Sequence, residues 1–255
     1  MSLQGRVALV TGAGWQGGIG KQIALTLAGY GAVVITNDIN SESAQETADQ
    51  LNSLGATAEA AVGDISDPSQ TQKMASEVVR KHGRIDILVN NAGIRSSGPL
   101  DELTSDHIDD VIRVNLKGVI LCAKAVIPAM KEQRYGRIIS IGSIAGKMGG
   151  GEFRTSTSIY SAVKAGIGGF TRSLARELGP YEITVNAVSP GLVDLGERSR
   201  QRPPEMIAEL HKRIPLGRLG KSTDIAETIA FLASEKAGYI TGQDIDVNGG
   251  WYMGS

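Results

Sequence analysis

Short apolar runs alternate with amphipathic stretches from one end of the chain to the other. Seven runs predict strands: RVALVTG, AVVITND, ATAEAAVGD, IDILVNNAG, GRIISIGS, TVNAVSPG and QDIDVN. Most of them are continuously apolar, which is typical of parallel strands that helices cover on both faces. Regular alternation of such strands with helices predicts an α/β fold, a doubly wound parallel sheet of seven strands.

The stretches between these runs predict helices. Asp67 and Pro68 supply an N-cap and a first-turn proline for a helix that continues to His82. Ser222 is expected to cap a later helix in the same way. Apolar residues recur at helical spacing in two stretches: Ile19, Ile23 and Leu27, and then Ile225, Ile229 and Leu232.

The chain has no internal repeat and no low-complexity linker, so we expect a single domain over residues 1–255. A domain of this size can bury about 70–75% of its unfolded surface. The one irregular stretch runs from Ser189 to Pro204 and contains PG, SRQR and PP.

Composition narrows the function classes. The 26 Lys and Arg residues and 27 Asp and Glu residues leave a net charge of −1, which predicts no general attraction to nucleic acid or to an anionic membrane. Lys117 and Lys124 interrupt the best apolar stretch, and VALV near the N-terminus is followed at once by TGAG. We therefore expect neither a membrane span nor a signal peptide. The single cysteine, Cys122, excludes an internal disulfide and favours a cytoplasmic location, and the three histidines have no metal-ligand spacing.

Glycine accounts for 33 residues, several of them in the segment TGAGWQGGIG between Thr11 and Gly20. Glycines after a first strand let the backbone turn sharply and approach a pyrophosphate at the N-terminus of the next helix. Asp38 ends the second predicted strand, where a carboxylate can accept hydrogen bonds from adenosine ribose hydroxyls. Each feature alone also fits a packing turn or a capping acid, but their order favours a dinucleotide site.

Further motifs follow in order: Asp64-Ile65 after the third strand, Asn90-Asn91-Ala92-Gly93 after the fourth, Tyr160-Ser-Ala-Val-Lys164, and Pro190-Gly191. With these motifs the whole chain resembles the short-chain dehydrogenase/reductase family. The resemblance implies a Rossmann fold, a small-molecule substrate and a nicotinamide cofactor, which we expect to be NAD. The residues expected to bind the cofactor are Gly12, Trp15, Gln16, Gly18, Ile19, Asp38, Asp64, Ile65, Asn91, Ala92, Gly93, Tyr160, Lys164, Pro190, Gly191 and Val193.

The resemblance also implies four catalytic residues: Asn115, Ser143, Tyr160 and Lys164. It assigns the nicotinamide ribose to Lys164, the substrate oxygen to Ser143 and a proton-relay water to Asn115. Tyr160 and Lys164 are four residues apart, so they share one helix face. A free tyrosine has a pKa near ~10, and a neighbouring ammonium, aided by the positive charge of the nicotinamide, is expected to lower it toward neutrality.

Two departures from the family pattern stand out. The segment between Ser143 and Tyr160 is longer than usual, which predicts an enlarged rim around the active site. Leu195 stands where the family has threonine, which removes one expected cofactor contact.

The main hypothesis is an NAD-dependent alcohol dehydrogenase that acts on a secondary alcohol or ketone of a small polar substrate, such as a polyol, sugar or sugar acid. The expected substrate residues are Arg95, Ser143, Arg154 and Tyr160, with Arg198, Arg200 and Arg202 in a lid over about 192–213. Guanidinium groups at these places favour an anionic substrate, although the arginines can instead pair with Glu152, Glu197 or Glu205 on a solvated rim.

Two alternatives stay open: an NADPH-dependent 3-oxoacyl-carrier-protein reductase, and a non-catalytic NAD-binding sensor or scaffold. Asp38, with no Arg or Lys directly after it, speaks against the first, and the complete set of Ser143, Tyr160 and Lys164 speaks against the second. The resemblance also predicts a homo-oligomer, a tetramer or dimer, that uses the small residues of SAVKAGIGGF and the segment 249–252.

Overall fold

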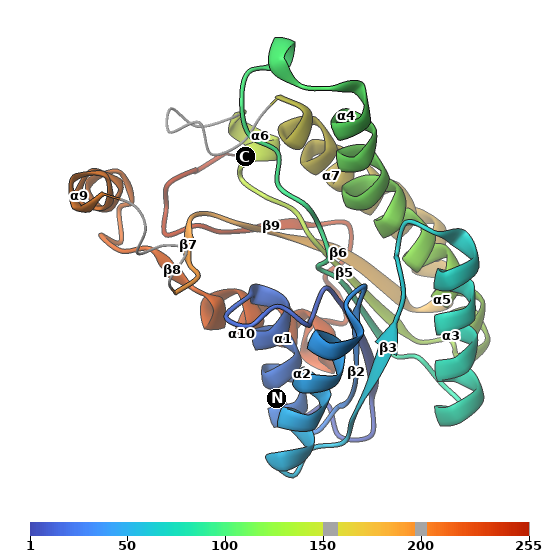
Figure 1. Ribbon diagram of the computed structural model, residues 1–255. Coiled ribbons are helices and arrows are strands. Elements are labelled where there is room, and N and C mark those ends of the chain that lie inside the picture. The colour runs from blue at the N-terminus through green and yellow to red at the C-terminus, as the bar shows by residue number, and fades with distance from the viewer. Residues whose placement is uncertain (150–157, 197–202, 255) are drawn as a thin grey trace.

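Seven parallel strands form the central sheet of the computed structural model, which describes residues 1–149, 158–196 and 203–254 (Figure 1). The order across the sheet is β3-β2-β1-β4-β5-β6-β9. The strands are β1 (Val7–Thr11), β2 (Val33–Asp38), β3 (Ala58–Val62), β4 (Ile87–Asn90), β5 (Gly136–Ile141), β6 (Ile183–Pro190) and β9 (Asp244–Val247). All seven predicted strands are confirmed, and this order is that of a Rossmann fold.

Helices cover both faces of the sheet (Figure 1). One layer consists of α1 (Ile19–Gly29), α2 (Ser41–Ser53) and α10 (Ser222–Ala233), and the other of α3 (Pro68–His82), α5 (Gly118–Gln133) and α7 (Ser158–Leu178). Shorter helices are α4 (Ser105–Ile112), α6 (Ala145–Met148) and α9 (Pro204–Arg213). Among the described residues, no helix is both long and apolar enough to span a bilayer.

The first strand shows why the runs are continuously apolar. Val7 and Leu9 pack against the layer of α3, α5 and α7, while Ala8 and Val10 pack against the layer of α1 and α10. Since side chains alternate between the two faces of a strand, a sheet covered on both faces requires an apolar residue at every position. Cys122 lies in this core as a buried residue of α5.

The predicted helix starts are confirmed in one case and corrected in the other. The Asp67 carboxylate accepts hydrogen bonds from the backbone N–H groups of Ser69 and Gln70, so it caps α3 as predicted. Ser222, predicted as a cap, is instead the first residue of α10. Asp224 explains the shift, because its carboxylate accepts the backbone N–H of Lys221 at 2.7 Å and thereby fixes the cap one residue earlier.

The stretch predicted to be irregular is partly regular. Ser189 and Pro190 continue β6, and β7 (Val193–Asp194) pairs with β8 (Gly220–Lys221) in a second, two-stranded sheet. Pairing requires a segment distant in sequence, so the local pattern did not predict it. In the expected lid, residues 192–196 and 203–213 are described and include β7 and α9.

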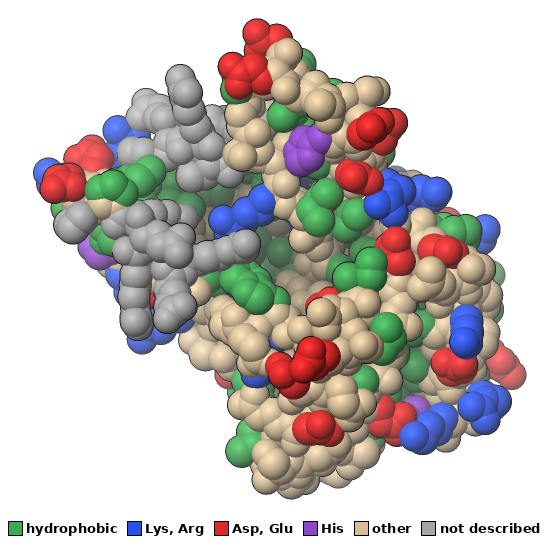
Figure 2. Space-filling view, viewed as in Figure 1, with side chains coloured by type: hydrophobic (Ala, Val, Ile, Leu, Met, Phe, Trp, Pro, Cys, Tyr) green, Lys and Arg blue, Asp and Glu red, His purple; other side chains and the backbone are tan. Residues whose placement is uncertain are grey.

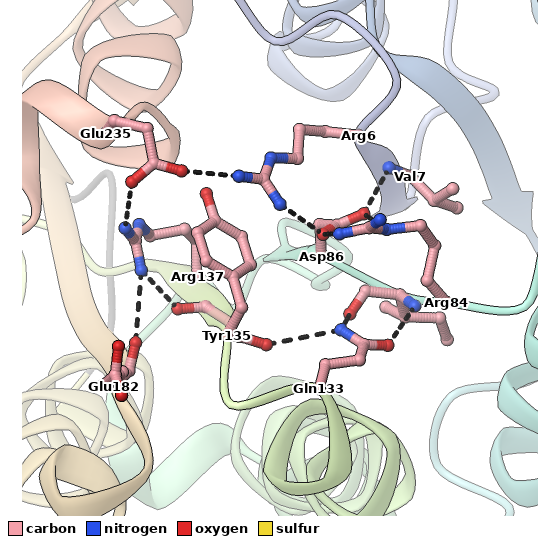
Figure 3. A network of polar contacts seen from close by, with 11 residues as sticks. Arg6, Val7, Arg84, Asp86, Gln133, Tyr135, Arg137, Glu182 and Glu235 are labelled. Carbon is pink, nitrogen blue, oxygen red and sulfur yellow. Dashed lines mark hydrogen bonds and ion pairs between the residues drawn. The ribbon is translucent and has the colours of Figure 1, made fainter.

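A network of charges ties the amino-terminal ends of the central strands together (Figure 3). The fully buried Asp86 carboxylate accepts hydrogen bonds from Arg6, from Arg84 and from the backbone N–H of Val7. Glu235 pairs with Arg6 and with the buried Arg137. This network lies at the opposite edge of the sheet from the carboxyl ends of the strands.

Candidate active site

Two cavities adjoin at the carboxyl ends of the strands. Because the strand order reverses between β1 and β4, a crevice opens there, and ligands of such sheets bind at this position. The larger cavity, of about 520 Å³, is lined by thirteen of the predicted site residues: Gly12, Trp15, Ile19, Asp38, Asp64, Ile65, Asn91, Ala92, Gly93, Arg95, Asn115, Tyr160 and Lys164. The smaller cavity, of about 170 Å³, is lined by seven of the predicted residues: Ile19, Arg95, Ser143, Tyr160, Pro190, Gly191 and Val193. Figure 2 shows the hollow between the two helix layers, with hydrophobic side chains around it.

Asn91 and Thr11 join the glycine-rich turn to the end of β4. The Asn91 side-chain amide donates to the carbonyl oxygens of Thr11 and Gly12, at 2.9 and 3.0 Å. In return, the Thr11 hydroxyl accepts the backbone N–H groups of Asn91 and Ala92. The predicted binding residue Asn91 therefore also shapes the turn itself.

The turn leaves space at the N-terminus of α1. Gly12 has φ +64°, and a Cβ on Gly20 would lie 2.3 Å from the Asn91 side-chain nitrogen, so side chains at both positions are disfavoured. The N-cap residue Gly18 offers no side chain to cap α1, and the first turn contains no acidic residue. Free N–H groups at a helix N-terminus form an anion site, so the turn fits the pyrophosphate of a dinucleotide.

Asp38 lies beside this turn with its carboxylate fixed. One oxygen accepts the backbone N–H of Gly14 at 3.0 Å, and the other accepts that of Asn40 at 3.1 Å. A carboxylate has about four acceptor positions, so two bonds leave capacity for ribose hydroxyls. Ile39, which also lines the larger cavity, is 70% exposed.

Asp64 is more occupied than the sequence suggested. Its carboxylate accepts hydrogen bonds from the hydroxyl and backbone N–H of Ser66 and forms an ion pair with Arg113 at 3.2 Å. These contacts hold the pKa of Asp64 below its ordinary value despite burial, which acts in the opposite direction. Arg113 lines the same cavity and was not predicted as a site residue. The one sequence signal for it is its position directly before the VNLKG motif.

The two predicted residues at the tip of the turn differ. Trp15 lines the larger cavity and packs over Gly18, where a Cβ would lie 2.7 Å from the indole ring. Gln16 does not line either cavity: its side chain binds Glu46 at 3.0 Å and also contacts Lys21. The prediction of a cofactor contact from Gln16 therefore finds no support in the geometry.

Asn115 lies in a π-helical turn, η2 (Arg113–Lys117), between α4 and α5. Its side-chain nitrogen donates to the carbonyl oxygens of Ile94 and Val111, both at 3.0 Å. Its side-chain oxygen is buried and has no hydrogen-bond partner among the described residues. A π-helical turn at this point is typical of a functional site.

Tyr160 lines both cavities, so it lies where they adjoin. Ser143, from the loop after β5, forms a side-chain hydrogen bond with Tyr160. Burial raises the pKa of Tyr160 above its ordinary value, and the Arg95 charge and the Ser143 hydrogen bond only partly oppose this. Burial therefore dominates the pKa of Tyr160 in the chain without a bound nicotinamide, and the lowering expected from Lys164 together with the positive charge of the cofactor stays a prediction.

Lys164 is buried one turn along α7 from Tyr160. Its ammonium donates to the carbonyl oxygen of Ile141 at 2.7 Å and lies 5.6 Å from the centroid of the Tyr160 ring. Burial lowers the pKa of Lys164 to about 8. The Ile141 carbonyl, at the end of β5, is a positioning group that no motif indicated.

The smaller cavity is mostly apolar where it is described. Besides Ser143 and Tyr160, its walls include Ile144, Met148, Leu192, Leu195 and Trp251. Trp251 was expected at a subunit contact, and the structure places it on this wall. Leu195 lines both cavities, so the position that departs from the family pattern lies beside the site.

Arg95 is the one predicted substrate arginine that the structure places, and it lines both cavities. Arg154, Arg198, Arg200 and Arg202 lie outside the described residues. Among the described residues, no group of His, Cys, Asp and Glu side chains has the arrangement of a metal site.

Comparison with known proteins identifies relatives along the full chain. The model of the family described as "Enoyl-(Acyl carrier protein) reductase" matches residues 12–252. The chain is 42% identical over 253 residues to the 3-oxoacyl-[acyl-carrier-protein] reductase FabG of Escherichia coli, covering 99% of this chain and 100% of that protein. It is 43% identical over 256 residues to (2S)-[(R)-hydroxy(phenyl)methyl]succinyl-CoA dehydrogenase subunit BbsD of Thauera aromatica, covering 98% of each.

A solved structure agrees with these relatives. The 3-oxoacyl-[acyl-carrier protein] reductase of Brucella melitensis with bound NAD has a TM-score of 0.88 and 35% sequence identity, covering 99% of this chain and 93% of that one. None of these relatives is named for a polyol or a sugar, so the small polar substrate expected from the sequence finds no support.

Proposed function

The chain belongs to the short-chain dehydrogenase/reductase family, and we propose that it is an NAD(H)-dependent oxidoreductase that interconverts 3-oxoacyl and 3-hydroxyacyl thioesters. The observation that carries the proposal is the smaller cavity, where Ser143 and Tyr160 lie beside the apolar side chains of Ile144, Met148, Leu192, Leu195 and Trp251, with Arg95 as the charged lining residue that the structure describes. Such walls suit an acyl chain better than a polyol, because burying many hydroxyls there without partners is costly. The relatives named for an acyl-carrier-protein thioester and for a CoA thioester support the same substrate class.

The chain's own residues account for the proton transfer. A bound nicotinamide supplies or accepts the hydride. In the reducing direction the Ser143 hydroxyl donates a hydrogen bond to the substrate carbonyl oxygen, and the Tyr160 phenol transfers its proton to that oxygen. Lys164, with its ammonium held by Ile141, keeps a positive charge near the ring of Tyr160 below pH about 8, which favours the phenolate that remains.

The preference for NAD rests on Asp38. Its carboxylate is held in place by Gly14 and Asn40, and the neighbouring lining residues Trp15 and Ile39 are uncharged. A 2′-phosphate brings up to about two negative charges, and like charges close together disfavour binding. We therefore propose the substrate class of the 3-oxoacyl-carrier-protein reductase alternative, but with NAD(H) in place of NADPH.

A turnover assay tests this proposal. Acetoacetyl-N-acetylcysteamine, a 3-oxoacyl thioester, is offered with NADH and with NADPH, beside a panel of polyols and sugar acids with NAD. We expect NADH oxidation with the thioester and little activity with the panel. Turnover of a polyol at a higher kcat/KM than that of the thioester contradicts the substrate class, and equal kcat/KM for the two cofactors contradicts the preference.

Two further expectations from the sequence are kept as proposals. A homo-oligomer is supported by the small exposed residues Ala162, Ala165 and Gly169 along one face of α7, where a second helix can approach closely. A cytoplasmic location is supported by the single, buried Cys122. Sedimentation of the purified chain distinguishes a monomer from a dimer or tetramer.

A further inference from the structure

Arg95 occupies an unusual position beside the site. It lies directly after the NNAG motif, it is exposed, and it lines both the larger and the smaller cavity. Among the described residues Arg95 forms no hydrogen bond and no ion pair. Of the three glutamates expected as alternative partners, Glu205 is described and forms no ion pair with Arg95, whereas Glu152 and Glu197 lie outside the described residues.

The backbone on both sides of Arg95 is held firmly. The carbonyl oxygen of Ile94 accepts a hydrogen bond from the Asn115 side chain at 3.0 Å. The hydroxyl of Ser96, a buried residue, is 2.9 Å from the Nε2 atom of His107 on α4. Hydrogen bonds of the two residues that flank Arg95 therefore fix the backbone on both sides, and Arg95 lies at the cavities in a defined position.

The surroundings of Arg95 favour an oxygen ligand of the substrate. Among the described lining residues of the smaller cavity, Arg95 is the only charged one, and none is Asp or Glu. The Arg95 charge also acts on Tyr160, where it opposes the effect of burial on the pKa. An unpaired guanidinium in mostly apolar surroundings binds carbonyl and carboxylate oxygens through charge-assisted hydrogen bonds.

We propose that Arg95 binds the C1 oxygen of a 3-oxoacyl substrate while the C3 carbonyl lies at Ser143 and Tyr160. In a thioester this ligand is the carbonyl oxygen, and in a free 3-oxo acid it is the carboxylate. C1 and C3 are separated by one methylene group, and Arg95, Ser143 and Tyr160 all line the smaller cavity, so one substrate molecule can contact all three. The inference rests on the proposed function and names the residue that selects a 1,3-dicarbonyl compound over a simple ketone.

The test compares three substrates in matched variants. Acetoacetyl-N-acetylcysteamine and acetoacetate each carry the C1 oxygen, and 2-pentanone lacks it. We expect Arg95→Gln to reduce kcat/KM about 10- to 100-fold for the two acetoacetyl compounds and to leave that for 2-pentanone nearly unchanged. Arg95→Lys, which keeps the charge, should recover part of the loss. Equal losses for all three substrates, or none, would overturn the inference.

Two controls separate this result from unrelated effects. Lys73→Gln removes a positive charge from the exposed face of α3, where Lys73 lies 3.9 Å from Glu77, and it should change none of the three kcat/KM values. Because Arg95 is exposed and forms no hydrogen bond or ion pair within residues 1–149, 158–196 and 203–254, Arg95→Gln should unfold at the same urea concentration as the wild type. The two acetoacetyl compounds are then compared with each other: the one whose kcat/KM falls more in Arg95→Gln depends more strongly on Arg95.

Failure of the proposed function is distinguishable from failure of this inference. If the wild type does not turn over acetoacetyl-N-acetylcysteamine, the proposed function is wrong. The role of Arg95 is then tested by binding of 3-hydroxybutanoate, measured by calorimetry in the presence of NAD. We expect Arg95→Gln to weaken that binding about tenfold or more. Equal affinity of 3-hydroxybutanoate for the wild type and the variant contradicts the inference.

Discussion

The Lys164 ammonium donates a hydrogen bond to the backbone carbonyl oxygen of Ile141 at 2.7 Å, which joins α7 to the carboxyl end of β5. The bond places a cation inside the protein with a neutral oxygen as its hydrogen-bond partner. Burial without a paired carboxylate lowers the pKa of Lys164 to about 8.

This burial predicts a pH-dependent stability. The folded-state pKa of about 8 lies below the unfolded value of 10.5, so between these values the unfolded chain binds a proton that the folded chain does not. The free energy of unfolding should therefore gain a contribution that rises by up to about 3 kcal/mol from pH 8 to pH 10.5. Lys164→Met should lack this rise.

Urea denaturation of the wild type and of Lys164→Met at pH 7.5 and pH 10 gives the change in unfolding free energy of each protein. The difference between the two changes is the contribution of Lys164. Cys122 and Tyr160 have raised pKa values, which lower stability at high pH, but they do so in wild type and variant alike. A parallel pH dependence of the two proteins contradicts the assignment.

Tyr160→Phe should keep cofactor binding and lose about 10²- to 10⁴-fold in kcat, because the ring remains and the transferable proton is gone. Stopped-flow or steady-state turnover of the thioester measures the loss, and fluorescence titration with NADH checks binding. Ser161→Ala, one residue along α7 with no hydrogen-bond partner for its buried hydroxyl among the described residues, is the matched control. A Tyr160→Phe variant with more than about a tenth of the wild-type kcat would exclude Tyr160 as the proton donor.

Asp38→Ala should relax the preference for NAD, because it removes the acceptor for ribose hydroxyls and the charge that opposes a 2′-phosphate. Adding Ile39→Arg should shift the preference further toward NADP, since Ile39 is exposed and lines the larger cavity. The measurement is the ratio of kcat/KM for NADH and NADPH. An unchanged ratio in the double variant would show that selection occurs elsewhere.

Asp86→Leu should destabilise the protein by about 1–3 kcal/mol, because it leaves the buried backbone N–H of Val7 without its acceptor and removes the partner of Arg6 and Arg84. The network (Figure 3) lies at the amino-terminal ends of the strands, and neither Asp86 nor its partners line either cavity, so kcat of the folded variant should match the wild type. Thermal unfolding tests the predicted loss of stability, and turnover at 20 °C tests the predicted unchanged kcat. Exposed Arg134→Gln, which removes an ion pair with Glu182, serves as a control and should cost under about 1 kcal/mol.

The sequence alone determined the layers of the fold and much of the site. A sheet covered on both faces needs continuous apolar strands, and runs such as VALV and VVIT show this locally, so all seven strands were predictable. Tyr160 and Lys164 share a helix face because of their spacing, and Asp38 comes directly at the end of a strand. These features depend only on neighbours along the chain.

Only the tertiary structure decided how the side chains are paired and buried. Lys164 contacts Ile141, Gln16 contacts Glu46 and Asp64 contacts Arg113, whereas Arg95 has no hydrogen-bond or ion-pair partner in the part of the chain that the structure describes. Their sequence motifs alone do not distinguish these cases. Trp251 reaches the smaller cavity for a similar reason, since β9 is placed beside β6 by the order of the sheet. Each partner comes from a distant segment that the strand order brings near. The burial and charge that set a pKa or leave a guanidinium free therefore arise only when the whole sheet has formed.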